Sequence, residues 1–163
     1  FAVPGNCDLP EVQQYLVSKE MDLHGKIIEF ESVKFAGIGY SLPCPGTTPG
    51  EVSERQFQSF FDRMDFPQDS DTPLLLVLHQ PPFGTVNDRI TSGAHVGSKT
   101  IRAMIEKLQP AICFSGHIHE GIGIDKIGKS QVVNPGMFSL GGYTYVELID
   151  GIFNIQIREV SND

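Results

Sequence analysis

The chain has 163 residues, of which 40% are hydrophobic and 20% are charged, and this composition predicts one soluble globular domain over residues 1–163. Twelve Lys and Arg side chains against twenty Asp and Glu side chains give a net charge of −8, so we expect no nucleic-acid-binding surface. No apolar run approaches the roughly 20 residues needed to cross a bilayer, so we expect no membrane partner.

The three cysteines are widely spaced and odd in number, which favours a reducing cytoplasm over a disulfide-linked secreted domain. They are Cys7, Cys44 and Cys113. No signal-peptide pattern opens the chain. We therefore expect the protein to be cytoplasmic.

The first segment predicts a short strand, "FAV", followed by a helix. Asp8 is the expected N-cap of this helix, with Glu11 completing a capping box and Pro10 in the first turn. The side chains that this helix is expected to bury are Val12, Tyr15 and Leu16.

A strand pair and a second helix are predicted next. The stretch "KIIEFESVKFAGIG" reads as two strands joined at Glu31 and Ser32, and "SLPCPGTTPG" reads as a Pro- and Gly-rich loop. The following helix carries an apolar face with helical spacing. That face consists of Phe57, Phe60, Phe61 and Met64.

The second half alternates strands and one helix before a strand-rich end. "LLLVLH" and "AICF" are continuous apolar runs, as expected of strands that are covered on both faces. Between them lie the long loop of residues 80–97 and a helix that Ser98 is expected to cap, with Ile101, Met104, Ile105 and Leu108 on its apolar face. Four more strands follow, "GIGID", "SQVVN", "YTYVEL" and "IFNIQI", and Asp150-Gly151 predicts a hairpin between the last two. A single sheet would leave the last strands uncovered, so the pattern favours an α/β fold in which two sheets pack together with helices outside.

Polar residues that can bind a metal follow three of the predicted strands. Asn6 follows "FAV", His79 ends "LLLVLH", and His117 and His119 follow "AICF". Because ligands of α/β sheets bind beyond the carboxyl ends of the strands, these side chains are expected to converge on one cleft. Imidazole suits Zn, Fe and Ni, and oxygen donors suit harder ions such as Mn.

Some of the polar residues have interpretations other than metal binding. A single histidine at a strand end is usually solvated or hydrogen-bonded, and we keep that interpretation for His24 and His95. A Cys-His protease pair that uses Cys7 is conceivable, although nothing nearby in the sequence supports it. The "GTTPG" stretch lacks the lysine of a phosphate-binding loop and is interpreted as a turn.

The motifs "GNCD", "LHQPP", "GHIHEG" and "VVNPG", in this order, resemble those of the calcineurin-like metallophosphoesterases. The resemblance covers the chain from Gly5 to about Gly136, and "GNCD" is similar to the pattern of the small prokaryotic members. It implies a four-layer αββα sandwich and a metal-dependent hydrolase of phosphate esters, most simply a phosphodiesterase.

The same resemblance implies roles for individual residues. Asn6, His79 and His117 would bind one divalent ion and His119 a second, with Mn, Zn, Fe and Ni as candidates. Asn6 and His117 would also serve catalysis, in which a metal-bound hydroxide attacks the phosphorus of a small phosphate ester. Asp8 would not be a ligand.

Two departures from the family pattern qualify these expectations. Cys7 stands where the family has a histidine, which makes efficient monoester hydrolysis a weaker expectation, because a thiol lacks the basicity and reach of imidazole. The D-x-H and G-D-x-x-D motifs, which supply the other ligands, do not occur before "GNCD". The β-α-β-α portion that carries them is therefore expected to be missing from this chain, which would be the C-terminal portion of the domain.

The missing motifs leave three possibilities: a longer natural chain, a partner chain that completes the domain, or a metal-poor relative that acts as a binding or scaffold module. The exposed edge predicts association with the completing segment, with a second copy in a homo-oligomer, or with another protein. By itself, the 163-residue chain is expected to bind at most one ion and to hydrolyse little. Asp88 and Asp125 are the first candidates for replacement carboxylates.

Overall fold

The computed structural model describes residues 1–66 and 71–160. Its main sheet has six strands in the order β1-β2-β3-β4-β6-β5. The strands are β1 (Lys26–Phe30), β2 (Val33–Ile38), β3 (Leu74–Leu78), β4 (Ile112–Phe114), β5 (Gly123–Ile127) and β6 (Ser130–Asn134). The four central strands are parallel and the two edge strands are antiparallel to their neighbours. The carboxyl ends of β3 and β4 therefore lie side by side.

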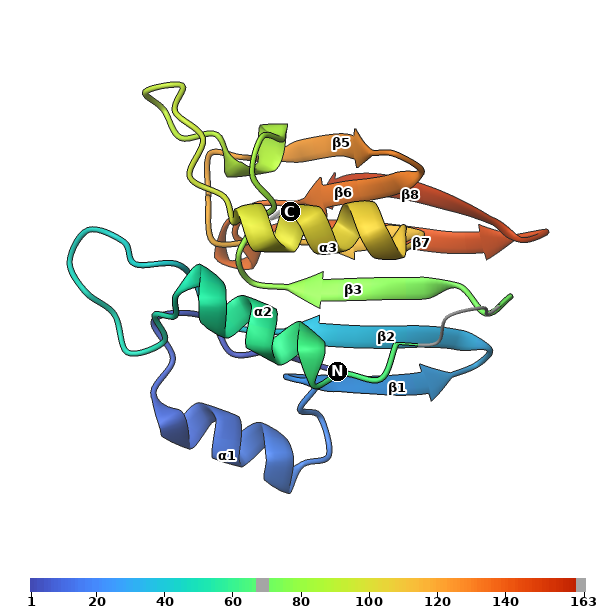
Figure 1. Ribbon diagram of the computed structural model, residues 1–163. Helices are drawn as coiled ribbons and strands as arrows, with labels where there is room; N and C mark the ends of the chain where they lie inside the picture. The colour runs from blue at the N-terminus through green and yellow to red at the C-terminus, as the bar shows by residue number, and fades with distance from the viewer. Residues whose placement is uncertain (67–70, 161–163) are drawn as a thin grey trace.

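Helices α2 (Glu54–Asp62) and α3 (Lys99–Leu108) cover one face of this sheet (Figure 1). Phe57 and Phe61 from α2 pack with Ile101 and Ile105 from α3 in the larger core cluster. The predicted Ser98 cap is confirmed, because its hydroxyl accepts a hydrogen bond from the Ile101 N–H. The same hydroxyl donates to the Glu54 carboxylate over 2.6 Å, which ties the starts of the two helices together.

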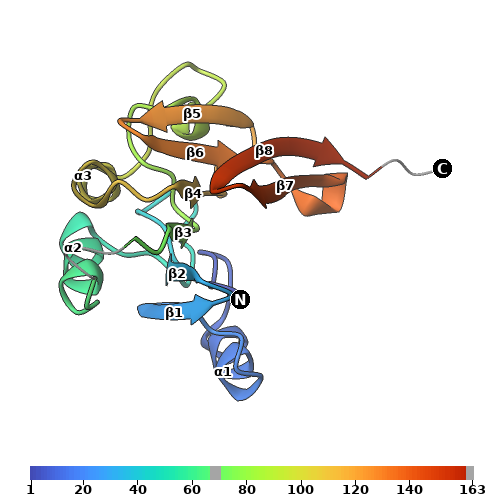
Figure 2. The same ribbon diagram turned by 90° about the vertical axis from the view of Figure 1, so that its right-hand side faces the viewer.

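The last two strands form a hairpin on the opposite face of the main sheet. Strands β7 (Gly142–Ile149) and β8 (Ile152–Glu159) pair with each other, and their apolar side packs against Leu75, Ile112 and Val133. Asp150 and Gly151 join them with φ values of 50° and 77°, as the predicted hairpin turn requires. Figure 2 shows the resulting layers of helices, main sheet and hairpin. The prediction of an α/β fold with two packed sheets is confirmed.

The first segment departs from the prediction. Helix α1 (Pro10–Ser18) forms, but its N-cap is Leu9, so the predicted Asp8 cap and Glu11 capping box are wrong. The Asp8 carboxylate instead accepts a hydrogen bond from the Gly5 N–H over 2.7 Å. This hydrogen bond belongs to the turn before the helix, so the carboxylate does not cap the helix.

The apolar face of α1 also differs from the prediction. Leu16 is buried, but Val12 and Tyr15 are 38% and 59% exposed, because the helix lies beside the sheet edge and not over its face. The "FAV" stretch forms only an isolated bridge between Ala2 and Asp22. The described residues also include two short 3-10 helices, Val86–Asp88 in the long loop and Phe138–Leu140 before β7. No helix in residues 1–66 or 71–160 has the length and apolar character needed to cross a membrane.

His24 has a structural role, as expected. Its ring packs between Tyr40 and Phe60, each with a centroid distance of 4.8 Å, and its Nδ1 accepts a hydrogen bond from the Gly39 N–H. Burial lowers the pKa of His24; nearby Asp22 opposes this shift, and Arg63 adds to it. The folded protein thus requires the neutral imidazole at this position.

The variant His24→Gln is expected to make stability less dependent on pH. Since the folded-state pKa lies below the unfolded value of about 6.5, the contribution of His24 to stability is complete above that pH and is lost as the pH falls below it. Gln keeps an acceptor for the Gly39 N–H but does not titrate. Urea unfolding at pH 7.5 and pH 5.5 measures the effect, and an equal pH-dependent loss in wild type and variant would contradict it.

Candidate metal centre

Two neighbouring parallel strands carry the first histidines of the centre. His79 follows β3 directly, and His117 follows β4 after Ser115 and Gly116. The Gly116 N–H donates a hydrogen bond to the His79 carbonyl over 3.1 Å, so the turns after the two strands are fixed to each other. The two imidazole rings lie 5.1 Å apart between centroids.

Asn6 joins these histidines from the loop before α1. Its Oδ1 lies 2.8 Å from Nε2 of His79 and 3.2 Å from Nδ1 of His117. The side chain is only 8% exposed, and its Nδ2 donates a hydrogen bond to the Thr48 hydroxyl over 3.0 Å. The backbone is held as well, because the Gly50 N–H donates to the Asn6 carbonyl. The amide oxygen is therefore presented between the two rings.

Two backbone features permit this close approach. A Cβ atom on Gly5 would lie 3.1 Å from Cε1 of His79, so a side chain at this position would crowd the ring. His117 itself has a φ of 64°, in the left-handed region that non-glycine residues rarely occupy. Such conformations persist where the surrounding structure fixes them, which is common at functional sites.

Both histidines are predisposed to be uncharged. Burial lowers the pKa of His79 to about 4, and the adjacent His117 contributes to the shift. Burial also lowers the pKa of His117, with a further contribution from His119. Since metals bind neutral imidazole, these side chains need not lose a proton near pH 7 before they bind an ion.

The three donor atoms fit a divalent ion. Ligands that each lie about 2.0–2.2 Å from one ion are themselves separated by about 3 Å, and the separations from Asn6 Oδ1 are 2.8 and 3.2 Å. The donor set of two nitrogens and one amide oxygen is compatible with borderline ions. Residues 1–66 and 71–160 contain no group of three or more His, Cys, Asp or Glu side chains that could hold an ion, so the third donor of this set is the amide oxygen of Asn6.

His119 lies close enough to lower the pKa of His117 but is not among the side chains that contact Asn6 in the described residues. Within the described part of the chain, the side-chain partners of Asn6 are Cys44, Thr48, His79 and His117. His119 is exposed and lines a separate pocket of about 380 Å³ with Met137 and Arg158. The structure thus joins three of the four predicted ligands and leaves the fourth on the neighbouring side.

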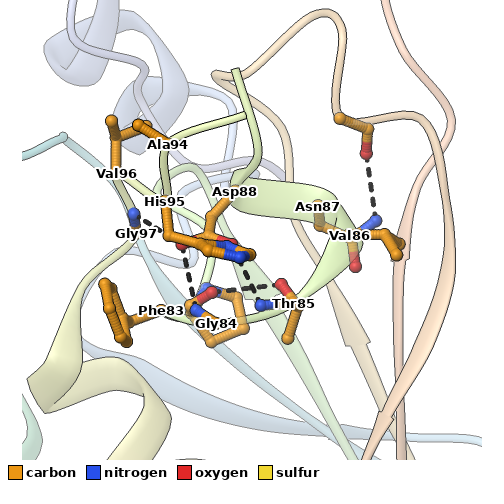
Figure 3. A network of polar contacts seen from close by, with 12 residues as sticks. Phe83, Gly84, Thr85, Val86, Asn87, Asp88, Ala94, His95, Val96 and Gly97 are labelled. Atoms are coloured by element: carbon orange, nitrogen blue, oxygen red, sulfur yellow. Dashed lines mark hydrogen bonds and ion pairs between the residues drawn. The ribbon is translucent and has the colours of Figure 1, made fainter. Parts of the chain in front are cut away.

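The two proposed replacement carboxylates have other contacts, and Figure 3 shows those of Asp88. Asp88 is fully buried and accepts hydrogen bonds from the N–H groups of Gly84, Thr85 and Gly97 and from Nδ1 of His95. Asp125 accepts hydrogen bonds from the N–H groups of Val86 and Lys126. These contacts give both carboxylates structural roles, and the hydrogen-bonded interpretation of His95 is confirmed.

Sequence patterns did not identify the residues that support the centre. Thr48, which holds the Asn6 amide, lies in the "GTTPG" stretch, for which the sequence predicts only a turn. Gln80, which follows His79, is 1% exposed and hydrogen-bonds to two loops. A buried glutamine is uncommon, but its burial cannot be read from local periodicity in a loop.

A protein-family model and a related protein each match most of the chain. A family model described as "Metallophosphoesterase, calcineurin superfamily" matches residues 1–157. The Methanocaldococcus jannaschii protein MJ1162 is 39% identical over 139 residues, which are 83% of this chain and 62% of that protein. This chain therefore spans less than two thirds of the length of that relative.

Solved structures share the fold. One crystal structure aligns with a TM-score of 0.77 at 22% identity and covers 98% of this chain and 65% of its own. The crystal structure of TT1561 from Thermus thermophilus aligns with a TM-score of 0.58 at 20% identity, over 94% of this chain and 70% of that chain. At these identities the likeness concerns the fold alone.

Proposed function

This chain belongs to the calcineurin superfamily of metallophosphoesterases, and on that premise we propose that the protein is a metal-dependent phosphodiesterase acting on a small phosphate ester. The observation that carries the proposal is the contact of Asn6 Oδ1 with both His79 and His117. The alternative is an inactive relative that serves as a binding or scaffold module.

The proposed centre holds two divalent ions, with Mn, Zn, Fe or Ni as candidates. Asn6, His79 and His117 would bind one ion, and His119 would contribute to the second. Ions at these positions would neutralise charge on the phosphoryl oxygens and activate a water molecule for attack on phosphorus. Further ligands for the second ion would come from outside these four side chains.

The chain's own residues prepare this chemistry. Thr48 fixes the Asn6 amide so that its oxygen faces the two rings, and burial keeps both imidazoles neutral. Asp8 holds the turn at Gly5, which brings the Asn6 loop against His79. These contacts orient the ligands before an ion binds, which is how positioning groups around a metal site act.

A diester is the better substrate because of Cys7. Cys7 is exposed at the position where the family motif has a histidine. A thiol is a weak hydrogen-bond donor and lacks the basicity of imidazole, so it gives little help to a poor leaving group. An ester with a good leaving group, such as a 4-nitrophenyl diester, depends little on that help.

Hydrolysis of bis(4-nitrophenyl) phosphate is the direct test. For the complete protein, which includes the ligands from outside these four side chains, we expect turnover with added Mn²⁺, loss of turnover with EDTA, and recovery when Mn²⁺ is restored in excess, because the proposed chemistry depends on the ions. Release of 4-nitrophenol is followed by absorbance. Turnover that persists in EDTA would contradict the proposal, whereas neither turnover nor metal binding would favour the scaffold alternative.

The variant Cys7→Ser is expected to change kcat/KM by less than about tenfold, equivalent to 1.4 kcal/mol. The reason is that Cys7 is exposed and is not one of the proposed ligands. The same assay, with metal content measured in parallel, checks this. Complete loss of activity with metal retained would instead favour a thiol nucleophile.

We also propose the cytoplasm as the site of action. Within the described residues all three cysteines are free, and Cys113 is buried in the core. Free thiols are typical of reducing compartments.

A further inference from the structure

A second pocket opens on the other side of the centre, beside His117. It has a volume of about 360 Å³, within the range of small-molecule sites. One wall is the loop of residues 42–45, and the other is the loop of residues 90–96. The apolar side chains that line it are Leu42, Pro43, Pro45, Ile90, Val96 and Ile118.

Gln80 joins the two walls to the centre. Its side-chain oxygen accepts a hydrogen bond from the Leu42 N–H over 2.9 Å, and its side-chain nitrogen donates to the Val96 carbonyl over 3.1 Å. Because Gln80 follows His79 directly and is buried, the two loops are fixed relative to the proposed ligand. The pocket is therefore preformed.

Glu120 fixes the far end of the second wall and sets the charge of the pocket. Its carboxylate accepts a hydrogen bond from the Thr91 hydroxyl over 3.1 Å. None of the residues that line the pocket is Lys or Arg. An anionic group in such a pocket would lose hydration without gaining an opposite charge, which is unfavourable.

Continuity with the centre distinguishes this pocket from the one beside His119. His117 both lines the pocket and contacts Asn6, whereas the other pocket contains Arg158 and Glu159 and none of the three joined ligands. A phosphoryl group bound at the centre would therefore have its ester arm directed to the apolar lining.

We propose that this pocket binds the neutral, apolar part of the alcohol of a phosphate ester, and so selects substrates with uncharged aromatic or branched alkyl arms. The inference rests on the proposed phosphodiesterase function and adds the class of substrate. It excludes esters whose corresponding arm carries a further anionic group.

The pocket can be tested without any metal by comparing the binding of 2-naphthol with that of its charged analogue, 6-hydroxynaphthalene-2-sulfonate. By naphthol fluorescence, wild type is expected to bind the neutral alcohol at least about tenfold more tightly, since an unpaired charge is excluded from an apolar site. Val96→Lys is expected to reduce or reverse that preference. Val96 is 36% exposed and holds its loop through backbone atoms, so the variant is expected to fold.

Two variants serve as controls. Val96→Leu keeps the lining apolar and should retain the preference for 2-naphthol. Val17→Lys makes the same change as Val96→Lys on the outer face of α1, where Val17 is 53% exposed, and should bind both probes like wild type. Thermal unfolding of each variant identifies any loss of folding.

The possible outcomes distinguish a failure of the pocket inference from a failure of the proposed function. Equal binding of both probes, or a preference unchanged by Val96→Lys in the folded variant, overturns the inference even if bis(4-nitrophenyl) phosphate is hydrolysed. Competitive inhibition of that hydrolysis by 2-naphthol in wild type, weakened in Val96→Lys, supports it. If no ester is hydrolysed by the complete protein with Mn²⁺, the proposed function fails and overturns the assigned substrate class, whatever the result with naphthol.

Discussion

In the complete protein, His79→Ala and His117→Ala are each expected to lower kcat/KM for bis(4-nitrophenyl) phosphate by more than about 100-fold in the presence of Mn²⁺. Groups that only orient a metal ligand are typically worth 10–100-fold, and these histidines are proposed as ligands. Each change also removes one of the two nitrogen atoms beside Asn6 Oδ1. Initial rates over a range of substrate and Mn²⁺ concentrations measure the effect.

The control is His24→Gln, which changes a half-buried histidine outside the centre. At pH 7.5 it should retain activity within about threefold of wild type, because a change remote from the site leaves transition-state contacts intact. Elemental analysis of the dialysed proteins should show less bound metal in both site variants than in His24→Gln. Near-normal activity and metal content in His79→Ala and His117→Ala would remove the basis for the proposed function.

The proximity of His79 and His117 could be predicted because the sequence marks the two strands that precede them clearly. The runs "LLLVLH" and "AICF" are short, continuous and apolar, as is typical of central strands, and parallel neighbours bring their carboxyl ends to one edge. The proximity of His79 and His117 then follows from topology. Asn6 is a weaker prediction from the residues alone, since "FAV" does not join the sheet as a regular strand.

The supporting contacts could not be predicted in the same way. Thr48 reaches Asn6 from a loop 42 residues away, and Gln80 bridges to Leu42 and Val96. Loops have no periodicity to fix which side chains point inward. The failed Asp8 cap has a similar cause, because the carboxylate had a second backbone donor within reach, the Gly5 N–H, and that bond formed instead.

The structure explains why the "GHIHEG" motif has two histidines separated by one residue, His117 and His119. Ile118 lies between them and is buried, and the two histidines line different pockets. The left-handed backbone at His117 turns the chain at this point. One short turn therefore supplies a candidate ligand to each side of the centre, and Glu120 continues from it to hold the apolar pocket.

The long loop that forms one wall of that pocket depends on Asp88, and Asp88→Ala is expected to destabilise the protein by about 3–5 kcal/mol. The carboxylate is fully buried and accepts four hydrogen bonds within residues 84–97. Alanine would leave three backbone N–H groups and the His95 ring without their acceptor, and each buried group left unpaired costs about 1–3 kcal/mol. Relaxation of the loop toward water keeps the total below the simple sum. Urea unfolding at pH 7.5 measures the loss.

Asp125→Ala is the matched control for this effect. Asp125 acts on the same 3-10 turn but accepts only one hydrogen bond from it, from the Val86 N–H. Its removal should cost about 1 kcal/mol, the usual contribution of a single hydrogen bond. The destabilisation caused by Asp88→Asn should lie between these two values. Its amide oxygen can still accept hydrogen bonds, whereas its amide nitrogen would face backbone donors. Equal destabilisation by Asp88→Ala and Asp125→Ala would mean that the four bonds do not act together to hold the loop, and that the pocket wall is fixed mainly by Gln80 and Glu120.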